Sequence, residues 1–162
     1  AGASIEPASG LFAWTPDEGQ GPGAYPLAVH VTDSGLLSAT AAFTVTVAEV
    51  NQAPAAVADT YVLTRNVPLV VPAPGVLAND YDLDLPANAL SVTLAVGPVS
   101  GVLDLRADGS FTYTPALDAS GTAGFSYVLS DGQGGVNTAV VTLTIYPLQF
   151  DHAIFLPLVR KE

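Results

Sequence analysis

The composition of this 162-residue chain sets 15 Asp and Glu residues against only four Lys and Arg, which gives a net charge of −11 at pH 7. So few basic side chains exclude nucleic acid and an anionic membrane surface as partners, and they favour cations. The chain has no cysteine, which excludes disulfides, thiolate metal sites and a cysteine nucleophile. No apolar run reaches the roughly 18 residues of a membrane span. The chain begins without Met or a signal sequence, so we expect a processed chain or a fragment.

Short runs of alternating Val, Thr and aromatic residues lie between the 13 prolines and 15 glycines, a pattern that favours strands over helices. The first two predicted strands, 25–31 and 42–48, are joined by a T-D-S-G turn. A-D-G-S at 107–110 predicts a tight hairpin turn, because Asp-Gly supplies the positive φ angles that such a turn needs. The regular spacing of turns predicts an all-β fold of the sandwich type. Seven more strands are predicted at 60–63, 68–71, 90–94, 102–105, 110–114, 125–129 and 139–145.

The sequence also repeats itself, once over residues 12–47 and again over 111–145. Each copy has an aromatic-x-aromatic-Thr-Pro strand end, then a strand that ends in Asp at a Gly turn, then an alternating strand; Asp33 and Asp131 occupy the same place. The boundary falls at N-Q-A-P, 51–54, which leaves only about 50 residues for the first copy. A sandwich that lacks its opening strands exposes its core and its edges. Those strands either belong to a longer parent protein or come from another chain.

The stretch A-N-D-Y-D-L-D-L-P places three carboxylates, Asp80, Asp82 and Asp84, at alternate positions with no basic residue near them in sequence. Like charges at this spacing repel and raise one another's pKa unless a cation lies between them. Calcium takes six to eight oxygen ligands and suits such a loop, whereas the alternative is a solvated acidic loop. An EF-hand is excluded because Leu85 stands at its glycine position, Ser91 stands at its terminal Glu position, and no helices flank the loop.

Three motifs of the second unit carry a family resemblance: P-G-V-L-A-N-D-Y-D-L-D, G-V-L-D-L-R-A-D-G-S-F-T-Y-T-P and F-S-Y-V-L-S-D-G-Q-G-G. Together they resemble bacterial cadherin-like repeats over residues 55–146. The first unit, through F-A-W-T-P-D-E-G-Q-G-P-G-A-Y, V-T-D-S-G and E-V-N-Q-A-P, resembles the C-terminal half of a dystroglycan-type cadherin-like or Ig-like repeat. The resemblance implies an all-β chain of tandem Ig-like/cadherin-like Greek-key β-sandwiches, the first one incomplete. The implied organisation is a partial repeat at 1–50, a calcium-binding linker at 51–54, a complete repeat at 55–147, and a tail at 148–162 that is either a donated strand or a sorting tail.

The same resemblance implies calcium at the junction of two repeats. In cadherins the ions are held by acidic residues at the base of one repeat, in the linker and at the top of the next. The linker here has neutral Asn51 and Gln52, with Glu49 nearby, where the family has aspartates, and this implies fewer or weaker ions. The implied metal ligands are Asp17 and Glu18 at the base, Asn51 in the linker, and Asp80, Asp82, Asp84 and Asp131 at the top.

Catalytic motifs are absent from the sequence, so we expect no enzyme. His30 alternates with valines in a predicted strand and is expected to point outward. Adjacent Asp17 and Glu18 are too close in one turn to flank a glycosidic bond. The alternating aromatic residues Trp14, Tyr25 and Tyr113 are expected to pack in the core rather than to form a sugar-binding platform.

The combined pattern predicts a calcium-stabilised structural or adhesive module of an extracellular bacterial surface protein. Its expected partners are neighbouring repeats of a longer chain or further copies of itself. In the second case the apolar tail 148–159 completes the first unit of another copy and builds a head-to-tail filament, burying Phe150, Ile154, Phe155, Leu156 and Leu158. The alternative function is a carbohydrate-binding accessory module of a larger secreted protein, with polysaccharide as its ligand.

Overall fold

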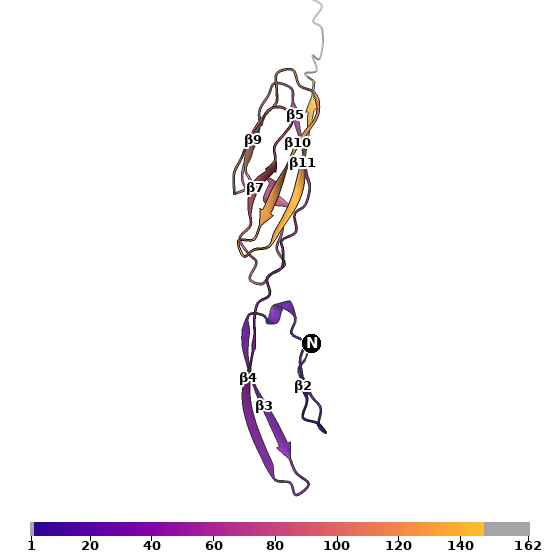
Figure 1. The fold of residues 1–162 in the computed structure, drawn as a ribbon, viewed down its shortest axis with the longest axis vertical. Helices are drawn as coiled ribbons and strands as arrows, with labels where there is room; N and C mark the ends of the chain where they lie inside the picture. Colours follow the sequence, from indigo (N-terminus) through magenta and orange to yellow (C-terminus); the bar gives the residue numbers. More distant parts are fainter. Residues whose placement is uncertain (1, 148–162) are drawn as a thin grey trace, which may run out of the picture. The chain divides into compact units, whose positions relative to one another are not determined.

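The computed structural model describes residues 2–147, and they form strands and two short 3₁₀ helices, which confirms the all-β class. The described residues divide into two compact units (Figure 1). Unit 1 comprises residues 1–52 together with the loop 82–88, and unit 2 comprises residues 53–81 and those from 89 onward. The tail 148–162, predicted to be a donated strand or a sorting tail, lies outside the described residues. Within the described range the two helices have three and four residues, far short of a bilayer-spanning length.

Unit 2 is a sandwich of two sheets, visible in Figure 1 around the labels β5 to β11. One sheet has the strand order β5-β11-β10-β7 and the other β6-β9-β8, with β5 parallel to β11 and the other pairs antiparallel. The chain crosses between the two sheets after β5, β6, β7 and β9, whereas β8–β9 and β10–β11 are hairpins within one sheet, and this mixture of connections is of the Greek-key type. The elements are β5 (Asp59–Thr64), β6 (Leu69–Val71), a 3₁₀ helix η2 (Gly75–Ala78), β7 (Ser91–Val96), β8 (Val102–Leu105), β9 (Phe111–Thr114), β10 (Gly121–Ser130) and β11 (Val136–Tyr146).

The core of unit 2 follows from strand alternation. In β11 the residues Ala139, Val141, Leu143 and Ile145 are buried, whereas Val140 between them is 57% exposed. These side chains meet aromatic rings from the facing sheet, and the phenylalanines of the core pack edge to face with ring centroids about 5 Å apart. Aromatic pairs in this geometry add to the stabilisation that comes from burial alone. The sandwich therefore has a complete apolar core without any disulfide.

The predicted A-D-G-S turn joins β8 to β9 and also fixes η2. Asp108 Oδ1 accepts a hydrogen bond from the Ser110 amide at 3.0 Å, and Gly109 adopts a φ of +81°. A Cβ atom at Gly109 would lie 2.0 Å from the carbonyl oxygen of Pro74, so the close approach of the two segments requires glycine. The carbonyl oxygen of Gly109 in turn accepts a hydrogen bond from the Val76 amide at 3.0 Å. This turn therefore holds η2 against the β8–β9 hairpin.

Unit 1 is built around one long hairpin of β3 (Gly23–Thr32) and β4 (Ser38–Val47), which pair along all ten residues of each strand. The turn between them is the predicted T-D-S-G, where Asp33 Oδ1 accepts hydrogen bonds from the amides of Gly35 and Leu37. His30 is exposed and its ring lies 3.0 Å from the Thr40 hydroxyl, as its outward orientation predicts. The other elements are β1 (Ser4–Ile5), β2 (Phe12–Ala13) and a 3₁₀ helix η1 (Glu18–Gln20).

Unit 1 has no apolar core among its described residues. None of residues 2–52 is buried, and the single buried residue of the unit, within the described range, is Asp84 of the loop 82–88. The hairpin nevertheless has an apolar face, because Tyr25, Leu27 and Val29 alternate with exposed residues and pair with β4 residues on the same face. The described residues of unit 1 thus form a hairpin with one apolar face, and the interpretation of this unit as part of an incomplete sandwich stays a prediction.

The alternation of β11 can be tested with one substitution at two neighbouring positions. Val141→Ala removes two buried methyl groups and should lower the free energy of unfolding of unit 2 by about 2 kcal/mol. Val140→Ala, on the exposed face, should change it by less than about 0.5 kcal/mol. The measurement is urea unfolding followed by circular dichroism. Equal losses in the two variants would contradict the assigned faces of β11.

Candidate cation site

Three segments of unit 1 bring carboxylates together. Glu18 is the first residue of η1, which begins after Pro16 and Asp17; the Asp17 amide donates to Gln20 Oε1 at 2.9 Å and so fixes this turn. Glu49 lies two residues beyond the end of β4. The third carboxylate, Asp84, comes from the loop 82–88, which groups with unit 1 although its flanking residues belong to unit 2.

Asp84 is the most constrained of these residues. Its side chain is 2% exposed, and both of its oxygens accept from the Gln52 amide at 3.1 Å. Asn88 Nδ2 donates to Asp84 Oδ2 at 3.0 Å and to Asn51 Oδ1 at 3.3 Å. These neutral donors stabilise the carboxylate partly. Burying a charge remains costly unless an opposite charge is close to it.

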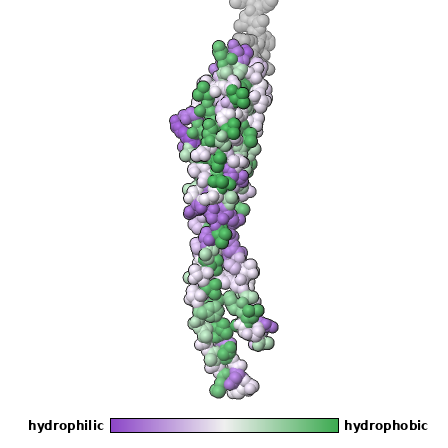
Figure 2. All heavy atoms as spheres, in the orientation of Figure 1, coloured by the Kyte–Doolittle hydropathy of each residue, from purple (hydrophilic) through white to green (hydrophobic). Residues whose placement is uncertain are grey.

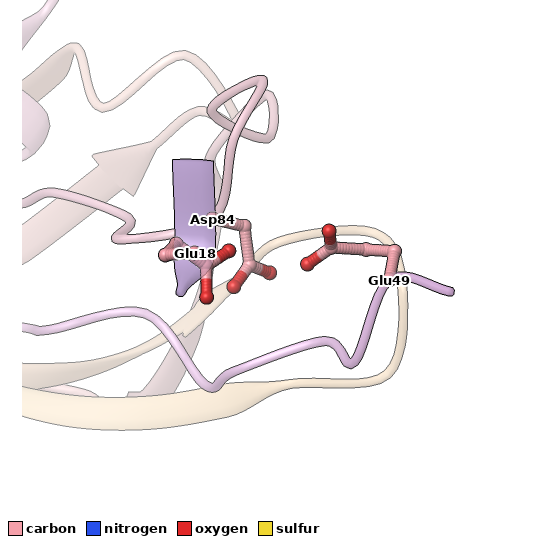
Figure 3. A group of neighbouring side chains, drawn as sticks. All are labelled: Glu18, Glu49 and Asp84. Carbon is pink, nitrogen blue, oxygen red and sulfur yellow. The ribbon is translucent and has the colours of Figure 1, made fainter. Parts of the chain in front are cut away.

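The three carboxylates converge on one point. One oxygen from each of Glu18, Glu49 and Asp84 lies within 4.8 Å of the others, and Figure 3 shows Asp84 between the two glutamates. Desolvation raises the pKa of Glu49, and the charges of Glu18 and Asp84 and a hydrogen bond with Glu18 raise it further. The described part of unit 1 contains no Lys or Arg. The Gln52 side-chain amide donates to Glu18 Oε2 at 3.2 Å. The cluster is therefore strongly negative, and the described residues of unit 1 offer it no basic counter-charge.

Asp82 adds a further unsatisfied oxygen to the loop. Its Oδ1 accepts from the Asp84 amide at 2.8 Å, which makes a tight Asx turn. Its Oδ2 is buried and has no hydrogen-bond partner among the described residues. A buried carboxylate oxygen without a donor indicates a place for a cation or a water molecule.

Two of the predicted ligands, Asp80 and Asp131, lie in different surroundings. Asp80 belongs to unit 2, where its carboxylate accepts from the Val57 amide at 2.7 Å and from the Tyr127 hydroxyl at 2.9 Å. Asp131, 3% exposed, also belongs to unit 2, and its Oδ1 accepts from the amides of Gln133 and Gly135. Of the seven predicted ligands, the structure thus brings Glu18 and Asp84 into one cluster.

Two contributors were absent from the predicted ligand set. The sequence places Glu49 only near the linker, and its position two residues before Asn51 is the signal that could have identified it. Asn88, which supports Asp84, has no motif that would have identified it. Its role depends on the path of the loop, and this path is not encoded in local spacing.

The aromatic residues pack in pairs. Trp14 and Tyr25 meet edge to face at 4.8 Å between ring centres, and Phe12 meets Phe43 in the same way at 5.7 Å. Tyr113 is fully buried in the core of unit 2. These rings face one another and do not form a flat exposed row. The carbohydrate-binding alternative therefore stays a prediction that no contact of the described residues favours.

The seven-stranded Greek-key sandwich of unit 2 is a fold of the cadherin-like class of β proteins, and the family comparison places it there. The model of the bacterial cadherin-like domain family matches residues 51–147, and the chain belongs to this family. A family of Ig domains, He_PIG, matches residues 1–48. Membership indicates an extracellular adhesive or structural module, in a fold class that is typically non-enzymatic. Among curated proteins, none matches the sequence significantly.

Solved structures support the same fold. Extracellular cadherin domains 1–5 of protocadherin gamma B2 match with a TM-score of 0.55 and 14% identity, over 90% of this chain and 30% of that one. Cadherin domains EC1–3 of protocadherin gamma C5 give a TM-score of 0.55 and 14% identity, over 88% and 51% of the two chains. An endo-fucoidan hydrolase of glycoside hydrolase family 107 is less similar, with a TM-score of 0.44 and 18% identity over 85% of this chain and 20% of that one. The chain spans about half or less of each of these proteins.

The repulsion of Glu49 by Glu18 and Asp84 can be tested in the absence of metal. Glu49→Gln removes one of three mutually repelling carboxylates, so in the presence of a chelator it should raise the unfolding temperature of unit 1 slightly. Because the folded-state pKa of Glu49 is raised, the repulsion grows as pH rises through that pKa, and the gain should be larger at pH 7 than at pH 4. The single tryptophan, Trp14, reports on unit 1 by fluorescence. The control is Glu6→Gln, outside the cluster; a gain of the same size there would show that net charge alone is responsible.

Proposed function

We propose that this chain is a non-enzymatic, calcium-stabilised structural or adhesive module of an extracellular bacterial surface protein. The observation that carries the proposal is the burial of Asp84 next to Glu18 and Glu49 in a unit whose described residues include no Lys or Arg. A buried carboxylate beside two others is stable when a cation is bound among them. Calcium is the proposed cation, because carboxylate and amide oxygens are the ligands it prefers.

The spacing of the cluster fits such an ion. Two oxygens bound to one calcium ion, each at about 2.3–2.6 Å from it, lie at most about 5 Å apart. The oxygens of Glu18, Glu49 and Asp84 are within 4.8 Å of one another. Three carboxylates supply up to six oxygens if they bind in the bidentate mode, and water completes the rest. Magnesium suits the cluster less well, because it demands near-octahedral geometry.

Each acidic residue near the cluster has a proposed role in binding the ion. Glu18, Glu49 and Asp84 hold the ion, and the unpartnered Oδ2 of Asp82 adds a further oxygen. Asn51 and Asp17 stay predicted ligands. The two remaining predicted ligands, Asp80 and Asp131, accept hydrogen bonds inside unit 2 and lie outside the proposed ion site.

Calcium bound in this way has a mechanical consequence. It joins η1, the end of β4 and the loop 82–88, three segments whose carboxylates otherwise repel one another. The chain passes between the units at residues 52–53, 81–82 and 88–89. Fixing the loop therefore orders three segments of unit 1 at once. A module stiffened by calcium is suited to an extracellular spacer or adhesive rod.

Calcium binding can be measured directly. Millimolar calcium should raise the unfolding temperature of unit 1, read from Trp14 fluorescence; at a hundred times the Kd the stabilisation is about 2.7 kcal/mol. Asp84→Asn and Glu18→Gln should each weaken calcium binding by about tenfold or more in isothermal titration calorimetry, because each removes a charged ligand. Asp104→Asn, an exposed residue of unit 2, is the control and should bind as the wild type does. No binding heat and no shift in unfolding temperature would contradict the proposal.

The open face of the unit 1 hairpin supports a second, finer proposal. A groove of about 720 Å³ runs over this face, and its lining includes Ile5, Phe12, Val31 and Phe43. Figure 2 shows apolar atoms exposed over the part of the chain that contains β3 and β4. In the described residues this sheet has only two strands, so each keeps one unpaired edge. We propose that the apolar segment 148–159 of a second copy adds a strand here and links copies head to tail.

Removal of the tail tests the assembly. If residues 148–162 are the donated segment, the full chain should form oligomers in light scattering, and the chain that ends at residue 147 should be a monomer. The matched pair is Leu156→Asp, which should disrupt assembly, and Lys161→Ala, which should not. Oligomers that persist without the tail, or a full chain that is monomeric at high concentration, would refute strand donation and leave the calcium proposal untouched.

A further inference from the structure

Unit 2 contains a second pair of carboxyl groups, separate from the cluster of unit 1. Asp59 is the first residue of β5 and is 9% exposed. Asp80 lies two residues beyond η2. Between them is the hydroxyl of Tyr127, a fully buried residue of β10. Three segments of the sandwich therefore meet at one phenol group.

The geometry at this phenol group leaves hydrogen-bond acceptors without donors. The Tyr127 hydroxyl oxygen lies 2.9 Å from Asp80 Oδ2, 3.3 Å from Asp59 Oδ2, and 3.3 Å from the carbonyl oxygens of both Val57 and Val76. A phenol has one proton to donate, and the shortest contact assigns it to Asp80. Asp59 Oδ2 then faces a hydroxyl oxygen with lone pairs. This contact is favourable when Asp59 itself carries a proton and donates it.

Among the described residues, no basic side chain compensates the pair. The two arginines of the described residues are engaged elsewhere, Arg65 with Asp118 and Arg106 with Asp104. The groups that face Asp59 are the Asp80 carboxylate, the phenols of Tyr127 and Tyr61, and the side-chain amide of Asn79. Apart from that amide and the phenols, the surroundings are apolar core or negatively charged.

These surroundings raise the pKa values of Asp59 and Tyr127. Burial, and after it the charge of Asp80, raise the pKa of Asp59 to about 6, although hydrogen bonds from Tyr127 and Asn79 oppose the rise. Burial also raises the pKa of Tyr127, so its phenol stays neutral. The carboxyl of Asp59 consequently changes charge in the mildly acidic range rather than near pH 4.

We propose that Asp59, Tyr127 and Asp80 form a proton-dependent clamp, in which a protonated Asp59 donates to the Tyr127 hydroxyl and that hydroxyl donates to Asp80. The clamp joins three parts of unit 2. Asp80 Oδ1 also accepts from the Val57 amide at 2.7 Å, which ties the end of η2 to the segment before β5. Asn79 Nδ2 donates to the Val57 and Ala58 carbonyls at 3.4 and 3.3 Å and reinforces the same connection.

The sign of the pH effect follows from the raised pKa. The folded state binds a proton at Asp59 that the unfolded state has lost above about pH 4. The contribution of the clamp is therefore complete at low pH and is lost as pH rises through about 6. Above that value two carboxylates compete for one phenol proton and repel each other. The attachment of η2, and of the chain that leads into the loop 82–88, then loosens.

The test uses the full chain in the presence of a chelator, followed by NMR between pH 4.5 and 7.5. The side-chain carbon of Asp59 should titrate with a midpoint near 6. The protection factor of the Val57 amide, which donates to Asp80, should fall by about tenfold or more over the same range. In Asp59→Asn this fall should be absent. In Asp104→Asn, which removes an exposed charge of the same unit, the fall should be the same as in the wild type.

Tyr127→Phe provides a second variant if Asp59→Asn does not fold. It removes the hydroxyl and keeps the ring, so Asp59 should still titrate while the protection of Val57 no longer follows its charge. An Asp59 midpoint near 4 in the wild type would overturn the clamp. So would a Val57 protection factor that falls with pH in Asp59→Asn as it does in the wild type. Because unit 1 and calcium play no part in these measurements, their outcome is independent of the proposed calcium site.

Discussion

Carboxylates that are buried without basic partners are the constraint on which most of this structure depends. The sequence has 15 acidic residues and four basic ones, so the usual solution, an ion pair, is unavailable to most of its acids. Exposed acids are solvated by water at little cost. Asp84 and Asp59 are buried, at 2% and 9% exposure, and each lies near other carboxylates. The chain must supply hydrogen bonds, a proton or a bound cation at each of these positions, because desolvated charge is too costly to leave uncompensated.

The two units differ in the interactions, other than the contacts of the buried carboxylates, that stabilise each of them internally. Unit 2 has a continuous apolar core of aliphatic and aromatic side chains, and a buried carboxyl group is a local cost that such a core can offset. Unit 1 has a long hairpin and aromatic pairs, and no apolar side chain of its described residues is buried. Its order depends on main-chain pairing and on the contacts of Asp84, Gln52 and Asn88. Compensation of the acidic cluster therefore matters more in unit 1 than it would in a unit with a full core.

Strand alternation made most of the fold predictable. The strands predicted at 25–31 and 125–129 correspond to β3 (Gly23–Thr32) and β10 (Gly121–Ser130), longer at both ends, because hairpin pairing extends strands past their most apolar residues. The strands β1 and β2 were not predicted, since two residues each are too few to show alternation. The predicted acidic run was divided by the fold: Asp80 lies with Tyr127 in unit 2 and Asp84 lies with Glu18 in unit 1. The sequence identifies the acidic residues as candidates, but the tertiary structure determines which residues each of them contacts.

The two proposed solutions have opposite dependence on pH. A cation in the unit 1 cluster requires ionised carboxylates, so protons compete with it and binding weakens as pH falls. The unit 2 clamp requires a protonated Asp59, so it weakens as pH rises. As pH rises through about 6, the proposed clamp releases the segment that leads into the loop 82–88, while the proposed calcium ion still holds the loop itself within unit 1. With these two proposed anchors, one end of the acidic run stays anchored on either side of about pH 6, which two calcium-dependent anchors or two proton-dependent anchors could not achieve.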